Sequence, residues 1–136
     1  MKVIIDTNVV MDVLLNRPAF FGDSRKVFEL AERGRIAGCI SASAITDVFY
    51  IAGRQIKDTE TLYQAVEMLA SLFAFVPVTR AMIGQALTLR WKDFEDAVQF
   101  VVAKENDAAY IITRDPTGYE TLDTPCISPT DFISRF

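Results

Sequence analysis

The sequence predicts an α/β fold, a three-layer α/β/α sandwich around a mainly parallel sheet of roughly five strands. Short apolar runs rich in branched residues alternate with longer segments of helical periodicity. Such runs are typical of strands buried on both faces, and their alternation with helices favours a parallel sheet covered on both sides. The 136 residues contain 51% apolar residues and no repeat or linker, which predicts a single domain over residues 1–136.

Each expected element is bounded by capping or turn residues, because Ser, Thr and Asp side chains accept hydrogen bonds from a helix's first turn. The expected strands are Lys2–Ile5, Ala37–Ile40, Phe75–Val78, Tyr110–Thr113 and Pro125–Ile127. The expected helices run over Val9–Leu15, from Asp23 or Ser24 to Gly34, from Ser41 or Ser43 to Gly53, from Asp58 or Thr59 to Phe73, from Thr79 to Trp91, onward from Asp93, and after Ser128.

Composition restricts the chemistry. The chain has no histidine, which excludes Ser-His-Asp and Cys-His catalysis and histidine-ligated zinc. Its net charge of −4 is unusual for a sequence-independent nucleic-acid binder, but a nuclease can concentrate negative charge in a metal site. Cys39 and Cys126 lie in short apolar runs and are expected as core residues.

No segment predicts export or membrane insertion. The start, Met1 to Asp6, becomes acidic too soon for a signal peptide, and no apolar run reaches membrane-spanning length. We therefore expect a soluble, cytoplasmic protein without a membrane partner.

Four acids are expected near one rim of the sheet. Asp6 follows the first strand and Asp115 follows the fourth, and ligands of open parallel sheets bind outside the C-terminal ends of strands. Asp96 lies in the first turn of its helix, where exposed N–H groups favour a carboxylate. Asp47 lies near the start of the third helix.

Four carboxylates near one rim of the sheet predict a cation-binding site. Two of them about 5 Å apart repel by roughly 3 kcal/mol at an effective dielectric of about 20. A divalent ion removes this cost, and all-oxygen ligation selects Mg²⁺ or Mn²⁺, without distinguishing the two. Such an ion can bind a phosphate oxygen and activate water, which suits phosphodiester hydrolysis without histidine.

The chain resembles the PIN domain family, and within it the toxin-like ribonucleases of bacterial toxin–antitoxin pairs. The similar segments are Ile5-Asp6-Thr7-Asn8-Val9-Val10, Ser41-Ala42-Ser43-Ala44-Ile45-Thr46-Asp47, Asp93-Phe94-Glu95-Asp96-Ala97-Val98-Gln99 and Tyr110-Ile111-Ile112-Thr113-Arg114-Asp115. Each segment alone is common, whereas their order and spacing over nearly the whole chain are specific. The resemblance implies a metal-dependent endoribonuclease, a homodimer and a small antitoxin partner.

The resemblance also implies the roles of individual residues. It assigns Asp6, Asp96 and Asp115 to the metal, with Asp47 assisting catalysis. The family most often has glutamate in place of Asp47, and the shorter side chain is expected to reach the metal through water. Asn8 and Thr113 are implied to orient a carboxylate or a water molecule at the site.

Each acid also has a structural interpretation. Asp6 can cap a helix, Asp96 can interact with a helix dipole, Asp115 can start a turn before Pro116, and Asp47 can be solvated. Asp93 is expected to cap the sixth helix and to support Asp96 rather than bind the metal.

Neighbouring residues have alternatives too. Glu95 is expected to be solvated. Arg17, Lys92 and Arg114 flank the rim and are candidates for phosphate contacts, although isolated basic residues are usually solvated. Trp91 is a candidate for base stacking, with core packing favoured.

Two other functions remain open at this point. A haloacid-dehalogenase-like phosphatase also has an aspartate after its first strand, but needs a second two positions on, where Asn8 stands. A nuclease-derived module that binds RNA or protein without cutting is compatible with the substitution at Asp47. The residues do not indicate which RNA is cut, or whether DNA is accepted.

Overall fold

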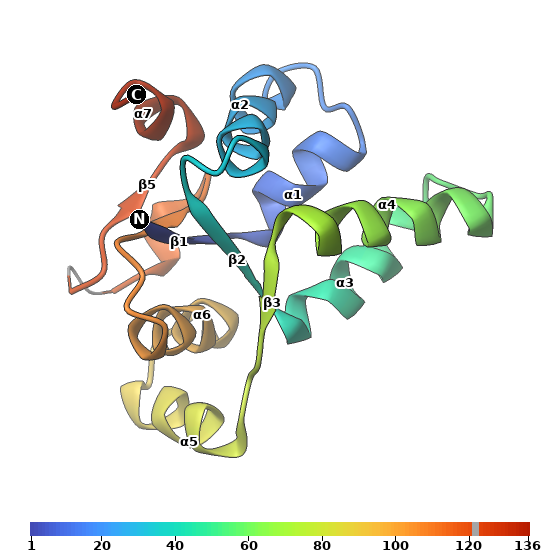
Figure 1. Cartoon of the computed structure of the whole chain (residues 1–136). Coiled ribbons are helices and arrows are strands. Elements are labelled where there is room, and N and C mark those ends of the chain that lie inside the picture. Colours follow the sequence, from blue (N-terminus) through green and yellow to red (C-terminus); the bar gives the residue numbers. More distant parts are fainter. Residues whose placement is uncertain (121–122) are drawn as a thin grey trace.

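The computed structural model describes residues 1–120 and 123–136 (Figure 1). Within these ranges one sheet has the strand order β3-β2-β1-β4-β5, and every neighbouring pair is parallel. Its strands are β1 (Lys2–Ile5), β2 (Ala37–Ser41), β3 (Ala74–Val76), β4 (Tyr110–Ile112) and β5 (Cys126–Ile127). Because β1 lies between β2 and β4, the segments that follow these three strands meet at one edge of the sheet.

Apart from α2, the helices begin close to the predicted capping residues. They are α1 (Thr7–Leu14), α2 (Phe21–Glu32), α3 (Ala42–Ala52), α4 (Thr59–Leu72), α5 (Arg80–Leu89), α6 (Phe94–Glu105) and α7 (Pro129–Ile133), with a 3₁₀ turn η1 (Pro116–Gly118). Side chains that accept a hydrogen bond from the first turn come from Asp6, Asp58, Thr79, Asp93 and Ser128.

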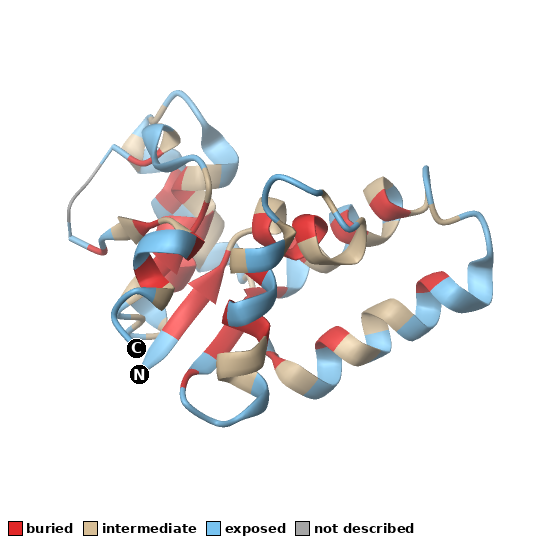
Figure 2. Ribbon diagram, turned by 90° about the horizontal axis from the view of Figure 1, so that it is seen from above, coloured by how far each residue is buried: buried red, intermediate tan, exposed pale blue. Residues whose placement is uncertain are grey.

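Helices cover both faces of the sheet, which confirms the three-layer prediction. Val3 and Ile5 pack with apolar residues of α1, α2, α3, α4 and α7, whereas Ile4 packs on the other face with α5 and α6. The strands are mostly buried, while the outer sides of the helices are exposed (Figure 2). This arrangement makes the central strands a rigid base for the side chains at their ends.

The start of α2 differs from the prediction. The helix begins at Phe21, so neither Asp23 nor Ser24 caps it. Ser24 is fully buried and its hydroxyl donates to Oδ2 of Asp12 at 3.4 Å, while Asp23 lies in the first turn and accepts from Thr130. Tertiary hydrogen bonds therefore use both side chains that local pattern assigned to capping.

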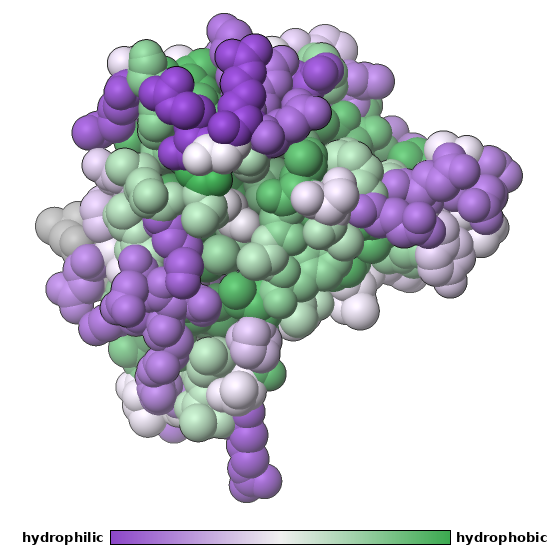
Figure 3. Space-filling model, in the orientation of Figure 1, coloured by the Kyte–Doolittle hydropathy of each residue, from purple (hydrophilic) through white to green (hydrophobic). Residues whose placement is uncertain are grey.

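Other boundaries shift by one or two residues. The third strand begins at Ala74 rather than Phe75 and ends at Val76, and the fourth ends at Ile112. On the face shown in Figure 3, hydrophobic residues gather over β3 and the adjoining end of α4. Over the described residues, no helix has both the length and the apolar character needed to span a membrane.

Candidate active site

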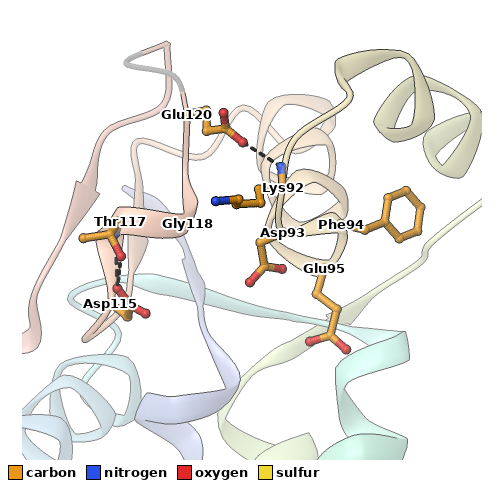
Figure 4. Close-up of a pocket in the computed structure, with 8 residues that line it drawn as sticks. All are labelled: Lys92, Asp93, Phe94, Glu95, Asp115, Thr117, Gly118 and Glu120. Carbon is orange, nitrogen blue, oxygen red and sulfur yellow. Dashed lines mark hydrogen bonds between the residues drawn. The ribbon is translucent and has the colours of Figure 1, made fainter.

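Two neighbouring pockets lie at the sheet edge where β1, β2 and β4 end. The first, the Asp6 pocket, has a volume of about 450 Å³, and its polar lining includes Asp6, Ser41, Asp47, Glu95, Asp96 and Gln99. The second, the Asp115 pocket, has a volume of about 650 Å³ and is lined by Lys92, Asp93, Phe94, Glu95, Asp115, Thr117, Gly118 and Glu120 (Figure 4). Phe94 and Glu95 line both, so the pockets adjoin at the start of α6.

Asp6 is held by hydrogen bonds from three directions. Its Oδ2 accepts from the hydroxyl of Thr113 at 2.7 Å, and its Oδ1 accepts from the amide of Thr7 at 2.7 Å and from Nε2 of Gln99 at 3.4 Å. Burial raises the pKa of the Asp6 carboxyl above its ordinary value, although these hydrogen bonds oppose the shift. Asp6 is thus both the cap of α1 and a side chain of the pocket.

Asp96 is the most perturbed acid of the site. Burial, followed by the charges of Asp93, Asp6, Asp115 and Glu95, raises its pKa from 3.8 to about 7. The amide of Asp96 donates to Oδ1 of Asp93 at 3.1 Å, so Asp93 caps α6 as expected. A carboxyl with a pKa near 7 is partly protonated at neutral pH, and a nearby cation would stabilise its charged form.

Gly118 lies against the Asp96 carboxylate, a contact that the sequence did not indicate. A Cβ placed on Gly118 would come within 1.7 Å of Oδ2 of Asp96. Any other residue at this position would therefore displace the carboxylate or the η1 turn. Asp96 lines the Asp6 pocket and Gly118 lines the Asp115 pocket, so this contact marks their boundary.

Asp115 and Asp47 lie farther out. Asp115 is exposed, and its Oδ1 accepts from the hydroxyl of Thr117 at 2.6 Å and from the Thr117 amide at 3.3 Å, which lowers its pKa. Figure 4 shows Asp115 and Asp93 on opposite sides of the Asp115 pocket. Asp47 is an exposed residue of α3 and lines the Asp6 pocket.

Asn8 and Thr113 connect α1 to the segment after β4. Nδ2 of Asn8 donates to the Thr113 hydroxyl at 3.3 Å, and the amide of Arg114 donates to Oδ1 of Asn8 at 3.2 Å. The Thr113 hydroxyl also accepts from the amide of Asp115 at 3.1 Å. Through Thr113, the hydrogen bonds of this network reach both Asp6 and the backbone of Asp115.

Two of the three candidate residues for phosphate contacts, Arg17 and Arg114, form ion pairs with Asp12. Nε and a terminal nitrogen of Arg114 lie 2.6 and 3.1 Å from the two carboxylate oxygens of Asp12, and Arg17 lies 3.3 Å from the same group. Asp12 is fully buried on α1. Periodicity placed Asp12 within a helix, but its burial depends on ion pairs that local sequence does not show.

Three further residues of the site were not identified from the sequence. Gln99 was quoted as part of a motif, but only the fold shows that its amide faces Asp6. Glu95 was expected to be solvated; it is exposed, yet it lines both pockets. Tyr119 is buried, and its hydroxyl has no hydrogen-bond partner among residues 1–120 and 123–136.

The oxygen donors suit a hard divalent cation. Mg²⁺ usually retains several water molecules and binds through one or two carboxylates, a number that Asp6 and Asp96 can supply. Across residues 1–120 and 123–136, no three acidic or cysteine side chains converge closely enough to hold one ion together. The side chain of Asp115, which is turned toward Thr117, would have to rotate or act through water to join them.

Comparisons with known proteins identify the family and the fold of this chain. Residues 2–117 match the PIN domain family. Ribonuclease VapC1 of Aquifex aeolicus (strain VF5) is 23% identical over 140 residues, which cover 99% of this chain and 95% of that protein. A toxin–antitoxin complex from Klebsiella pneumoniae contains a chain with a TM-score of 0.69 and 18% identity, over 93% of this chain and 97% of that one.

The fold also occurs in VapC20 of Mycobacterium tuberculosis, described as a sarcin-ricin loop cleaving toxin. Its TM-score is 0.69 at 15% identity, over 85% of this chain and 92% of that one. The family match covers most of the 136 residues and includes the four acids singled out in the sequence. The chain therefore belongs to the PIN domain family.

Proposed function

We propose that the protein is an endoribonuclease that hydrolyses RNA phosphodiester bonds with Mg²⁺ or Mn²⁺ at the Asp6 pocket. The observation that carries this proposal is the crowding of acids around Asp96, which raises its pKa to about 7. Among the described residues, seven acidic residues and one basic residue, Lys92, line the two pockets, and this excess of negative charge favours a bound divalent cation. Membership of the PIN family and the likeness to a named ribonuclease support RNA as the substrate.

In this proposal Asp6 and Asp96 would hold the ion, and Asp115 would join them through a water molecule or after its side chain turns away from Thr117. A bound Mg²⁺ or Mn²⁺ would neutralise the scissile phosphate and make a water molecule more nucleophilic. Thr113 and Gln99 fix the orientation of Asp6 through their hydrogen bonds. Asn8 and Asp93 act one step further out, through Thr113 and through the first turn of α6.

We also propose a small antitoxin as protein partner, a homodimer and a cytoplasmic location. The likeness to a chain solved in a toxin–antitoxin complex supports the first of these. Exposed side chains such as Tyr50, Tyr63 and Leu87 provide apolar area that a protein partner would cover. The single domain over residues 1–136 remains part of the same proposal.

Metal binding is expected to stabilise the wild type through the Asp6 pocket. A ligand that binds only the folded state at 100 times its Kd adds about 2.7 kcal/mol, so Mg²⁺ or Mn²⁺ should raise the melting temperature by several degrees. Asp6→Asn should show a much smaller rise, because it removes one of the two carboxylates. Thermal melts with metal and with chelator measure this. Equal shifts in both proteins would place the metal elsewhere.

Asp47 tests the departure from the usual family pattern. Asp47→Glu is expected to retain or increase RNA cleavage, because the longer side chain reaches farther from α3 into the Asp6 pocket. Asp47→Ala should reduce the rate less than Asp96→Ala does, because Asp47 is exposed and Asp96 is half-buried. Initial cleavage rates of the three variants in Mn²⁺ decide the order. A larger loss for Asp47→Ala would reverse our ranking of the ligands.

A further inference from the structure

Lys92 and Phe94 lie at the start of α6, and their side chains point to two different sides of it. Figure 4 shows the Lys92 side chain pointing toward the Thr117–Gly118 turn and the ring of Phe94 pointing to the other side of the helix. Lys92 lines the Asp115 pocket, and Phe94 lines both pockets. Phe94 and Asp96 both line the Asp6 pocket, so a ligand that contacts Lys92 and Phe94 passes beside the proposed metal site.

The ring of Phe94 is available for stacking. It is 42% exposed at the junction of two pockets, although an aromatic side chain normally gains stability by burial. Trp91, the other aromatic residue of this segment, packs at 5.1 Å from the ring of Phe100 and at 6.3 Å from that of Tyr119. Tyr50 also lines the Asp6 pocket, but the guanidinium of Arg54 lies 4.8 Å from the centre of its ring. We therefore take Phe94 as the ring on which an unpaired base can stack.

Lys92 supplies the positive charge that a polyanion needs here. It is the one basic residue among the described residues that line the two pockets, whose acidic members are Asp6, Asp47, Asp93, Glu95, Asp96, Asp115 and Glu120. Its amide donates to Glu120 at 2.9 Å, while its ammonium forms no ion pair with any residue of 1–120 or 123–136. Arg17 and Arg114, by contrast, are engaged by Asp12.

We propose that Lys92 and Phe94 hold a single strand of RNA across the start of α6, Lys92 through a backbone phosphate and Phe94 by stacking on an unpaired base. Duplex bases are already stacked and paired, so this arrangement selects single-stranded RNA. The inference rests on the proposed RNA substrate and names the residues that position it.

The test measures binding rather than cleavage, in the Asp96→Asn variant. A labelled single-stranded RNA and the same RNA as a duplex are titrated by fluorescence anisotropy. Phe94→Ala and Phe94→Leu should weaken single-strand binding by about 10-fold and leave duplex binding within about 2-fold, and Phe94→Trp should restore it. Lys92→Ala should weaken the binding of both single-stranded and duplex RNA. It should also reduce the slope of the logarithm of the binding constant against the logarithm of salt concentration by about 0.7, and Lys92→Arg should restore both.

Tyr63→Ala is the matched control, because Tyr63 is an aromatic residue of α4 with 53% exposure outside both pockets. Abasic substitution along the RNA locates the stacked base, and the loss caused by Phe94→Ala should vanish at that position. Unchanged single-strand binding in Phe94→Ala, or an equal loss of binding in Tyr63→Ala, would overturn the inference. Phe94 would then be a surface residue available to a protein partner. A wild type that binds in this pattern but does not cleave would refute the nuclease while leaving the inference standing.

Discussion

Asp96→Asn is expected to reduce metal-dependent RNA cleavage by about 100-fold or more and, without metal, to stabilise the fold. The loss of activity follows because a metal ligand contributes several kcal/mol to the transition state, and each tenfold in rate corresponds to about 1.4 kcal/mol. The gain in stability follows because asparagine keeps the shape of the side chain but removes a charge from the acids around it. A side chain that served only as a structural hydrogen-bonding group would give the opposite change in stability.

The stability difference should depend on pH. The folded-state pKa of Asp96 is about 7 and the ordinary value is 3.8, so between these values the folded protein binds more protons than the unfolded one. Wild-type stability should therefore fall as pH rises from about 4 to 7 and level off above 7. Such a pKa difference corresponds to about 4 kcal/mol, which solvent screening at this partly exposed group reduces to about 2 kcal/mol.

Urea unfolding of wild type and Asp96→Asn, both in the presence of a chelator and from pH 4.5 to 8, measures this difference. Asp107→Asn provides the control, because Asp107 is exposed beyond the opposite end of α6. The Asp96→Asn protein should gain relative to wild type across the window, whereas Asp107→Asn should follow wild type. An Asp96→Asn protein that is less stable at every pH would make Asp96 a structural residue.

Among the variants proposed here, Asp12→Ala is expected to cause the largest loss in the free energy of unfolding, about 3 kcal/mol. The fully buried carboxylate accepts from Arg114, Arg17 and Ser24, so its removal leaves a cavity and an unpaired guanidinium. The Arg114 side chain is 26% exposed, so water can solvate part of its charge. The expected loss of stability is therefore at the lower end of the range of about 3–5 kcal/mol for breaking a buried ion pair. Asp12→Asn should cost less, because it retains the shape and one acceptor.

The same change should reduce cleavage, because Arg114 lies between Thr113 and Asp115 and its position fixes both. Urea unfolding at pH 7 and cleavage rates in Mn²⁺ are the two measurements. Asp131→Ala, an exposed acid in the first turn of α7, should change stability by less than about 1 kcal/mol. If Asp12→Ala proved as mild as Asp131→Ala, the ion pairs around Asp12 would not hold the segment that carries Asp115.

Local pattern was sufficient for the architecture. The apolar runs that end at Ile5 and Ile112 are buried parallel strands, and Asp93 and Ser128 cap the helices α6 and α7 as expected. These features depend on neighbours along the chain, and so periodicity and capping residues reveal them. The predicted start of α2 was wrong because the Ser24 hydroxyl donates a hydrogen bond to Asp12 of α1, a contact that the local sequence does not show.

The site shows the same division. The positions of Asp6 and Asp115 after neighbouring strands follow from topology, which places the C-terminal ends of β1 and β4 side by side. The contact of Gly118 with Asp96 and the hydrogen bond from Gln99 to Asp6 require tertiary structure. The direction of the Asp115 side chain, toward Thr117, also could not be read from its place in the chain.

The most direct measurement of the central claim is cleavage of single-stranded RNA by wild type, Asp6→Asn, Asp96→Asn and the control Asp107→Asn, each in Mn²⁺, in Mg²⁺ and in chelator. The account predicts that wild type and Asp107→Asn cut only when metal is present, and that both site variants lose cleavage by about 100-fold or more. Site variants that cleave at the wild-type rate, or a folded wild type that binds the metal and leaves every RNA intact, would contradict it.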